Sequence, residues 1–250
     1  AIWNIHYPND EVYKVTVHVV DAIIKNATDF KEILSNATNE YIILGNDIPK
    51  VESYPLTYTT FTGTLDGCGH SIGEISYGYS EHYTSGWLFY IFNGTIKNIS
   101  FDKMSGLRGS AELNDYRQSG IAFQVGNGSA LLENVFINAT TSTGAEVNAM
   151  FGTAWGDAYI TLREVVVIVN GTGTGSAYAI IGDNTSGRVT SVRNVYVSGV
   201  NGNGTPTPMS PSGNIEGCAY KTQAELLQMA NNSDTTLTEM AQNAIKNVLG

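Results

Sequence analysis

The chain has 250 residues, of which 42% are apolar and 14% charged, and its formal net charge is −10. This length and composition suffice for one large hydrophobic core or two small ones, so we expect a globular protein. The acidic balance, with no basic stripe, excludes a surface that binds nucleic acid by neutralising phosphates. No apolar run approaches the roughly 18 residues that span a bilayer, so we expect no membrane span.

Residues 1–20 are predicted to form an N-terminal strand arm. In the stretch EVYKVTVHVV, Val15, Val17 and Val19 alternate with polar residues, and a period of two indicates a strand. The arm either lies along its own protein or adds to an exposed strand edge of another copy. Strand addition would join protomers through main-chain hydrogen bonds.

Residues 21–200 are predicted to form the central unit, which begins with a short helix. In DFKEILSN, Phe30, Ile33 and Leu34 share a helical face after Thr28, so we expect a helix that caps the first strands.

The stretch FTGTLDGCGH, residues 61–70, is interpreted as a tight corner. Gly67 and Gly69 are expected to take positive φ, and Asp66 to accept hydrogen bonds from backbone amides. His70 is expected to bond across the turn to a neighbouring strand. A role for His70 as a catalytic base or metal ligand is the alternative, and the other histidines lack ligand spacing with it.

Four later segments share one pattern, which is an apolar strand, a Gly/Asn turn and a second strand. Their second strands begin IKNI at Ile96, LENV at Leu132, LREV at Leu162 and VRNV at Val192, at steps of 36, 30 and 30 residues. Such a period is typical of units that stack because none can bury its own apolar face. The expected fold class is therefore all-β, a single-stranded parallel β-helix (a solenoid) with short capping helices at the N- and C-terminal ends.

Stacking would place equivalent residues of successive repeats about 4.8 Å apart. The first and fourth residues of each tetrapeptide are expected to face inward as aliphatic columns. The third residue is expected at a corner, where Asn tolerates left-handed backbone and its amide can bond the Asn below. The predicted corner residues are Asn98, Asn134 and Asn194, with Glu164 interrupting the column.

The stretches DFKEILSNATNEYIILGNDI, from Asp29, and FTGTLDGCGHSIGEIS, from Phe61, resemble the first repeats of bacterial and archaeal surface proteins with GLUG motifs. The resemblance covers residues 29–201 and implies a right-handed parallel β-helix at a cell surface. Cys68 stands where that pattern has Asn, and the repeats lack a clean Gly-Leu-Phe-Gly tetrapeptide.

Residues 201–250 are predicted to form a Pro/Gly-rich loop and C-terminal capping helices. Thr222 with Glu225, and Thr236 with Glu239, have the spacing of capping boxes. The second of these helices has one apolar face, which is expected to cover the last repeat. Binding of a partner by this face is the alternative.

The two cysteines, Cys68 and Cys218, lie in an early and a late segment. The stacking rise alone separates them by about 20 Å, beyond the roughly 4.4 to 6.8 Å Cα spacing of a disulfide, unless the Pro-rich loop folds back. An intrachain disulfide is the default for a secreted chain with an even count. A bridge between Cys218 of one subunit and Cys68 of the next, and two free thiols, are the alternatives.

The Asn-x-Ser/Thr sequon occurs ten times, whereas independent draws would give roughly four. The excess favours a secreted glycoprotein of an archaeal or eukaryotic cell surface, although turn chemistry produces the same triplets by accident. Asn98 is assigned to the corner and not to a glycan. The predicted N-glycosylation sites are Asn26, Asn36, Asn93, Asn127, Asn138, Asn170, Asn184, Asn203 and Asn231.

No catalytic residue, metal site or cofactor is predicted. Polysaccharide lyases and hydrolases need clustered carboxylates, and the outward residues in register here are one acid among three bases. Acidic residues expected in turns are not brought together by any sequence motif. The outward residues are Lys97, Glu133, Arg163 and Arg193, and the turn acids are Asp102, Glu112, Asp115, Glu146, Asp157 and Asp183.

The expected function is that of an extracellular, N-glycosylated structural protein of a cell surface, which self-assembles into a filament or surface array. Its expected partners are copies of itself, by strand addition or end-to-end stacking, and covalent N-glycans. One alternative is a carbohydrate-binding or carbohydrate-cleaving module with exposed aromatics such as Trp87, Tyr90, Trp155 and Tyr159 as sugar platforms. An adhesin that grips a protein receptor is another.

Overall fold

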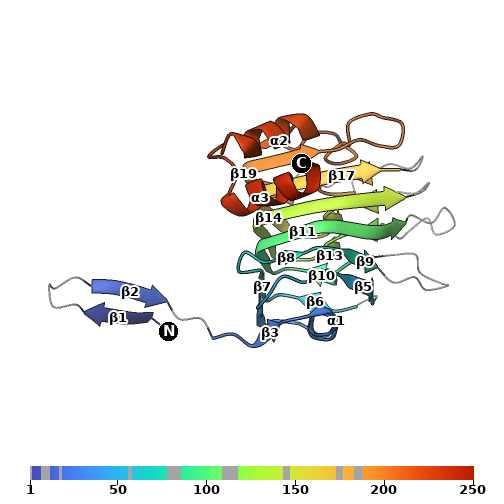
Figure 1. Ribbon diagram of the computed structural model, residues 1–250. Coiled ribbons are helices and arrows are strands. Elements are labelled where there is room, and N and C mark those ends of the chain that lie inside the picture. Colours follow the sequence, from blue (N-terminus) through green and yellow to red (C-terminus); the bar gives the residue numbers. More distant parts are fainter. Residues whose placement is uncertain are drawn as a thin grey trace.

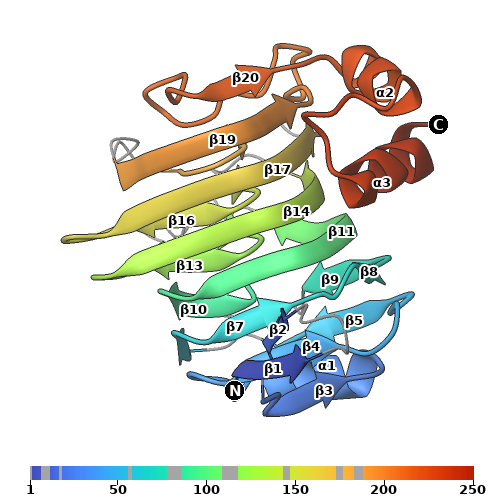
Figure 2. The same cartoon turned by 90° about the vertical axis from the view of Figure 1, so that its left-hand side faces the viewer.

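The computed structural model describes residues 2–6, 12–16, 19–55, 58–77, 86–108, 118–142, 147–172, 177–182 and 188–250. Most strands within these ranges belong to one large parallel sheet of eleven strands, accompanied by smaller parallel sheets of four and three strands. Figures 1 and 2 show the large sheet built up in chain order, from β3 at one end to β20 at the other.

The main path of the large sheet is β20-β19-β17-β14-β11-β7-β4-β3, and β5, β8 and β9 pair beside this path. Its strands are β3 (Ala22–Ile24), β4 (Tyr41–Leu44), β5 (Val51–Tyr54), β7 (Thr64–Asp66), β8 (Ser71–Ile72), β9 (Ile75–Tyr77), β11 (Thr95–Arg108), β14 (Ser129–Ser142), β17 (Tyr159–Gly171), β19 (Val189–Ser198) and β20 (Cys218–Tyr220). The four-stranded sheet comprises β6 (Thr60–Phe61), β10 (Phe89–Phe92), β13 (Ala122–Val125) and β16 (Phe151–Ala154). The three-stranded sheet comprises β12 (Gln118–Ser119), β15 (Val147–Asn148) and β18 (Ala177–Tyr178).

The four sequence repeats pair with one another residue for residue. Ile96 lies opposite Leu132, Leu132 opposite Leu162, and Leu162 opposite Val192. The fourth positions of the tetrapeptides form a second column in the same register, ending at Val195. The predicted steps of 36, 30 and 30 residues are therefore confirmed as the spacing of neighbouring parallel strands.

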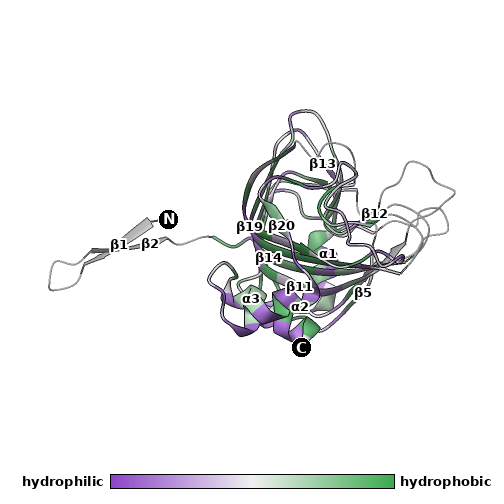
Figure 3. Cartoon of the chain, turned by 90° about the horizontal axis from the view of Figure 1, so that it is seen from above, coloured by the Kyte–Doolittle hydropathy of each residue, from purple (hydrophilic) through white to green (hydrophobic). Residues whose placement is uncertain are grey.

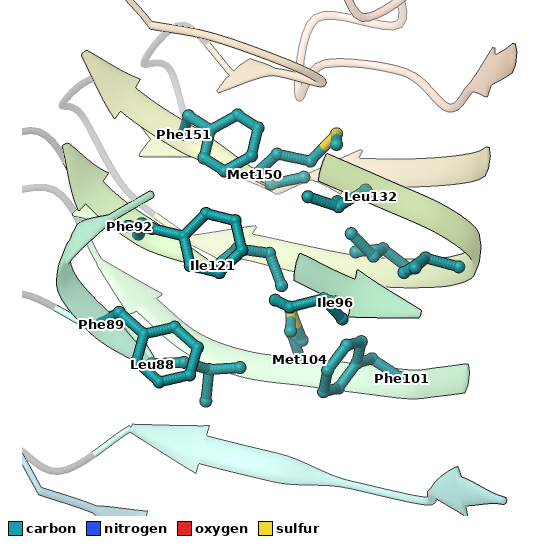
Figure 4. Packing of buried hydrophobic residues seen from close by; sticks show 14 of the residues in the cluster. Leu88, Phe89, Phe92, Ile96, Phe101, Met104, Ile121, Leu132, Met150 and Phe151 are labelled. Atoms are coloured by element: carbon teal, nitrogen blue, oxygen red, sulfur yellow. The ribbon is translucent and has the colours of Figure 1, made fainter. Parts of the chain in front are cut away.

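A continuous apolar core lies between the sheets (Figure 4). The aliphatic columns of the large sheet are fully buried except at Val192, which is partly buried. The four-stranded sheet contributes stacked phenyl rings, with Phe61 and Phe89 4.4 Å apart between ring centroids and Phe92 and Phe151 6.2 Å apart. Burial of each such side chain contributes about 1.5–3 kcal/mol, so the repeated columns are the main source of stability.

The predicted N-terminal helix is present as α1 (Ala27–Leu34), with Phe30 and Leu34 buried in the core. Its N-cap is Asn26, whose side-chain oxygen accepts hydrogen bonds from the backbone amides of Thr28 and Asp29. This satisfies two of the amides that the first turn of a helix leaves free.

The C-terminal helices α2 (Gln223–Asn231) and α3 (Glu239–Leu249) lie against the outer face of the large sheet (Figure 3), where α3 is beside β11 and β14 and α2 packs against α3. A second apolar cluster forms there, in which Ile245 and Ala241 of α3 pack with Phe136, Val166 and Ile168 of the sheet. These outward apolar residues explain the placement, because a parallel sheet is usually covered on both faces.

The expected fold class is corrected by this arrangement. The structure shows one large parallel sheet with two smaller ones, and its C-terminal helices cover a face of the large sheet where capping of an end was expected. A single-stranded β-helix with helices across both ends is therefore wrong as a description of this chain. The sequence periodicity indicated the strand spacing correctly, but it did not reveal that outward positions of β14 and β17 are also apolar.

Capping boxes were predicted at the start of both C-terminal helices, and the structure contains one of them. The capping box of Thr222 and Glu225 is confirmed at the start of α2. The second predicted box is wrong, because Thr236 bonds Asp234 in the preceding turn and Thr238 is the N-cap of α3.

The N-terminal arm contains a hairpin and is not a single strand. β1 (Ile2–His6) and β2 (Val12–Thr16) pair antiparallel, from Ile2 opposite Thr16 to His6 opposite Val12. Figure 1 shows this hairpin standing apart from the sheets. Of the predicted alternating valines, Val17 lies outside the described residues.

Candidate functional site

A column of left-handed residues runs along one corner of the large sheet. Asn98, Asn134 and Asn194 have φ of 51°, 53° and 52°, and Glu164 has φ of 56°. The predicted left-handed backbone at the corner is thus confirmed. Glu164 has the same backbone conformation, although its side chain is not an amide. Arg193 Nη2 instead donates to Glu164 Oε1 at 2.9 Å.

Side-chain hydrogen bonds link this column to the elements on either side of it. Asn134 Nδ2 donates to Asn98 Oδ1 at 3.0 Å, and Asn98 Nδ2 donates to Asp66 Oδ1 at 3.1 Å. At the other end Thr238 Oγ1 donates to Asn134 Oδ1 at 2.6 Å, which fixes the start of α3. The asparagine amides therefore tie three strands and a helix together.

Asp66 is the charged member of this network. Burial raises its pKa, but hydrogen bonds from the Cys68 amide and from the Asn98, Tyr41 and Lys97 side chains outweigh burial and hold that pKa below its usual value. Tyr41 Oη donates to Asp66 Oδ2 at 2.9 Å, and Lys97 Nζ lies 3.1 Å from the same oxygen. The partners saturate the carboxylate, so it acts as a structural anchor.

The backbone of the 61–70 corner differs from the prediction at one position. Gly69 has φ of 86° as expected, but the other left-handed residue is Cys68, with φ of 53°, and not Gly67. Gly67 is needed for a different reason, since an added Cβ would lie 2.3 Å from Asn98 O. The predicted cross-strand bond is present, with His70 Nδ1 3.2 Å from Asp47 Oδ1.

A small polar pocket of about 170 Å³ lies between α3 and the large sheet. Asp47, Asp102 and Ser100 line it from the sheet side, and Asn243 and Asn247 from α3. Burial raises the pKa of Asp102, whereas the Ser71 amide and His70 hold the pKa of Asp47 below its usual value. Two carboxyl groups whose pKa values are shifted in opposite directions therefore line one pocket, which is the pattern that acid and base pairs share.

Of the other predicted turn acids, only Asp157 is described, and it does not line this pocket. Asp102 itself lies in strand β11 and not in a turn, and Asp157 lies in the turn before β17. The remaining predicted turn acids, Glu112, Asp115, Glu146 and Asp183, lie outside the described residues. Within the ranges given above, no group of three or more His, Cys, Asp or Glu side chains is placed to hold a metal ion.

The predicted glycosylation sites fall into two groups, because a glycan attaches to the side-chain nitrogen of Asn. Asn26, Asn127, Asn203 and Asn231 are exposed. In the first three the side-chain oxygen accepts backbone hydrogen bonds, so the bond to the fold is made by the oxygen and not by the nitrogen that carries a glycan.

The asparagines of the second group are tied into the fold by side-chain hydrogen bonds, although Asn36 among them is also exposed. Asn36 donates to Glu32 O at 2.8 Å, Asn93 to Asn127 O at 3.4 Å, and Asn138 to Asp102 O at 2.8 Å. Asn170 is half-buried and its oxygen accepts from Gln223 of α2. Asn184 lies outside the described residues. Asn26, Asn127, Asn203 and Asn231 are therefore the sites most accessible to modification, because they are exposed and their side-chain nitrogens are not among those bonded within the described part of the fold.

The four aromatic residues predicted as sugar platforms differ in exposure. Trp155 and Tyr159 are 62% and 52% exposed, in and just after the turn that joins β16 to β17, whereas Trp87 is only 1% exposed. Tyr90 stacks on Phe123 with 5.1 Å between ring centroids and also contacts the exposed Tyr58. The neighbours that complete this stack were not recognisable from the sequence, because Tyr58 and Phe123 come from different repeats.

The two cysteines are free, so the predicted default of an intrachain disulfide is wrong. Cys68 lies just after β7, and its neighbours Gly67 and Gly69 bond to β11. Cys218 lies in β20, which is five strands beyond β7 in the large sheet. Five strand spacings of about 4.8 Å give a separation near 24 Å, far beyond disulfide reach. Burial raises the pKa of Cys218 to about 12, so this thiol is also a poor nucleophile.

Each end of the main path of the large sheet is a short strand that, among the described residues, pairs on one side only. At one end β3 has three residues, with Ile23 exposed, and the N-terminal hairpin precedes it. At the other end the short β20 pairs with β19 only from Val195 to Val197. Comparisons with family models, curated proteins and solved structures give no match. Among the described residues, no helix is long and apolar enough to cross a membrane.

Proposed function

We propose that this chain is an extracellular, N-glycosylated structural protein of a cell surface that assembles with copies of itself into a filament or array. The observation that carries the proposal is a pair of strand edges, at opposite ends of one parallel sheet, that have no partner among the described residues, with an N-terminal hairpin apart from the sheets at one of them. Unpaired edges are templates for pairing with another chain.

The exposed sequons support the extracellular part of the proposal. Asn26, Asn127, Asn203 and Asn231 offer accessible side chains, and glycans on exposed turns add soluble bulk at a surface. Mass spectrometry of the native protein should find glycans on some of these four asparagines. Unmodified peptides at all four positions would contradict this part.

The geometry alters the expected chemistry of assembly. If the sheet continued from β20 of one copy into β3 of the next, Cys218 would be three strand spacings, or about 14 Å, from Cys68 of the neighbour. That distance rules out the intersubunit disulfide in such a stack. The assembly should therefore rest on main-chain pairing and withstand reducing agent.

Electron microscopy of the native material, with and without reducing agent, tests the proposal. We expect regular polymers in both conditions. Dispersed single particles at all concentrations would overturn it, and polymers that dissolve only on reduction would show that a cysteine bridge, which the present geometry excludes, holds them.

A carbohydrate-binding module is the second candidate, favoured by the exposed Trp155 and Tyr159 in one turn region. Aromatic side chains at such exposure are suited to stacking on sugar rings. Binding to a glycan array that is lost in Trp155→Ala would support this candidate. Trp87→Ala is not a usable control, because Trp87 is buried in the fold.

A further inference from the structure

We propose that the N-terminal hairpin of one copy pairs with the open edge of β19 in a second copy. This inference rests on the proposed self-assembly and names the surface that would carry it. The proposed receptor is the groove beside the first half of β19, and the donor is strand β2.

The first half of β19 is paired on one side only. Val189, Ser191, Val192 and Arg193 lie opposite residues of β17, from Ile160 to Arg163. On its other side, β20 reaches β19 only at Val195 to Val197. Among the described residues no strand pairs with that side of residues 189–193, so the main-chain groups pointing there lack a strand partner.

A groove of about 360 Å³ runs along this unpaired stretch. It is lined by Val189, Thr190, Val192, Glu216 and Gly217. Val189 and Val192 are partly buried and pack against the main core, so two valine side chains lie in an otherwise mostly polar groove, beside backbone groups that have no strand partner among the described residues. Strand addition uses this combination, since main-chain bonds give affinity and pockets accept alternate side chains.

The same chain contains a strand that fits this description. β2 reads VYKVT and is paired only with β1 in the described residues, and from Tyr13 to Thr16 its sequence alternates apolar and polar residues as in a half-buried strand. A two-stranded hairpin is at best marginally stable alone in water, so a third strand would stabilise it.

The donor and the receptor lie at opposite ends of the large sheet. The hairpin precedes β3, and β19 is next to the terminal strand β20 at the far end. The hairpin therefore faces away from its own receptor. Six Cα steps join Thr16 to Ala22, a tether of about 20 Å when extended, which reaches a neighbour at the β3 end.

Pairing of this kind joins different surfaces of two copies. Such a heterologous contact leaves a free donor at one end and a free receptor at the other, so it propagates into an open chain unless the rotation closes a ring. A polymer is therefore the expected product.

Cysteine cross-linking within polymers tests the inference. In a Cys68→Ser, Cys218→Ala background, chains with Lys14→Cys are mixed with chains carrying Thr190→Cys and oxidised with copper phenanthroline. We expect a disulfide-linked dimer of the two variants on a non-reducing gel. Thr60→Cys, an exposed threonine on the edge strand of the four-stranded sheet, is the matched control and should not cross-link.

The outcomes separate this inference from the proposed function. Polymers that form without a cross-link to residue 190, or that cross-link to residue 60 instead, overturn the β19 receptor and leave self-assembly standing. Absence of polymers from the unmodified protein overturns both. Deletion of residues 1–18 should leave folded single particles, and a deletion variant that still polymerises as readily as the full chain would also refute the inference.

Discussion

The middle of the large sheet and its two ends differ in strand pairing and in burial. In the middle, β14 is paired with β17 from Ser129 to Thr141, and the side chains in both inward columns are fully buried. At the ends, β3 and β20 are three residues long, and half of β19 has no strand partner on one side among the residues that the structure describes. The difference teaches that the stability of one chain comes from its centre, while its ends retain unsatisfied pairing capacity.

The largest effect is expected from a cavity in the middle. Leu132→Ala removes a fully buried side chain between Ile96 and Leu162 and should lower the free energy of unfolding by about 2–5 kcal/mol. Val192→Ala, in the same column but partly buried at the open edge, should cost less than about 1.5 kcal/mol in the single chain. Chemical denaturation followed by circular dichroism measures the free energy of unfolding of both variants. Equal losses would contradict the difference in stability between the middle and the end of the sheet.

The corner column gives the next effect. Asn134→Ala removes the bonds to Asn98 and Thr238 and places a Cβ without amide compensation at φ of 53°. We expect a loss of about 2–3 kcal/mol from two hydrogen bonds and the left-handed backbone together. Asn134→Gly should recover about 1 kcal/mol because glycine adopts this φ freely. An alanine variant as stable as the glycine variant would mean that the backbone strain is negligible.

Much of the middle could be predicted from the sequence. The tetrapeptides at Ile96, Leu132, Leu162 and Val192 aligned correctly because inward, outward and corner positions each need a different side chain. The left-handed corner was predictable since few residues other than Asn and Gly adopt that conformation readily. Local signals of this kind survive in a single sequence.

The ends and the outer face could not be predicted in the same way. α3 covers Phe136 and Val166 on the outer face of the large sheet. Both faces of these strands are apolar, and periodicity does not show which face a helix covers. The His70 contact with Asp47, and the sharing of one pocket by Asp47 and Asp102, join residues from separate segments that no motif connects. Half of β19 lacks a partner on one side among the described residues because β20 is short. The length of β20 is set by the loop that precedes it, and no sequence pattern indicates where that loop ends.

Two carboxylates near the middle should respond to pH in opposite directions. The folded-state pKa of Asp66 is lowered, so its contribution is present above the unfolded value near 4 and is lost as pH falls through the folded pKa. The pKa of Asp102 is raised by burial, so its ionised form opposes folding at neutral pH and this penalty disappears as pH falls.

Asparagine variants test this pair at pH 7 and at about pH 2, which is below the unfolded pKa of both groups. Asp66→Asn should destabilise the protein by about 1–2 kcal/mol at pH 7, and by less at about pH 2. Asp102→Asn should stabilise it at pH 7, with a gain that shrinks as pH falls through the raised pKa. Denaturation midpoints at the two pH values measure both, and shifts of the same sign for the two variants at pH 7 would contradict the assignment.

The smallest effect is expected at the β20 end, where α2 begins directly after the last strand. Thr222 and Glu225 cap each other reciprocally, and Thr222→Ala should cost about 1 kcal/mol. Because this end is thinly paired, the loss should appear as local opening of α2, measured as faster amide hydrogen exchange there with little change in β14. Thr222→Ser keeps the hydroxyl and is the matched control. If exchange accelerated equally in β14, the end and the middle would unfold as one unit, and an assembly that pairs at the open half of β19 would then stabilise the whole chain and not only its terminal strands.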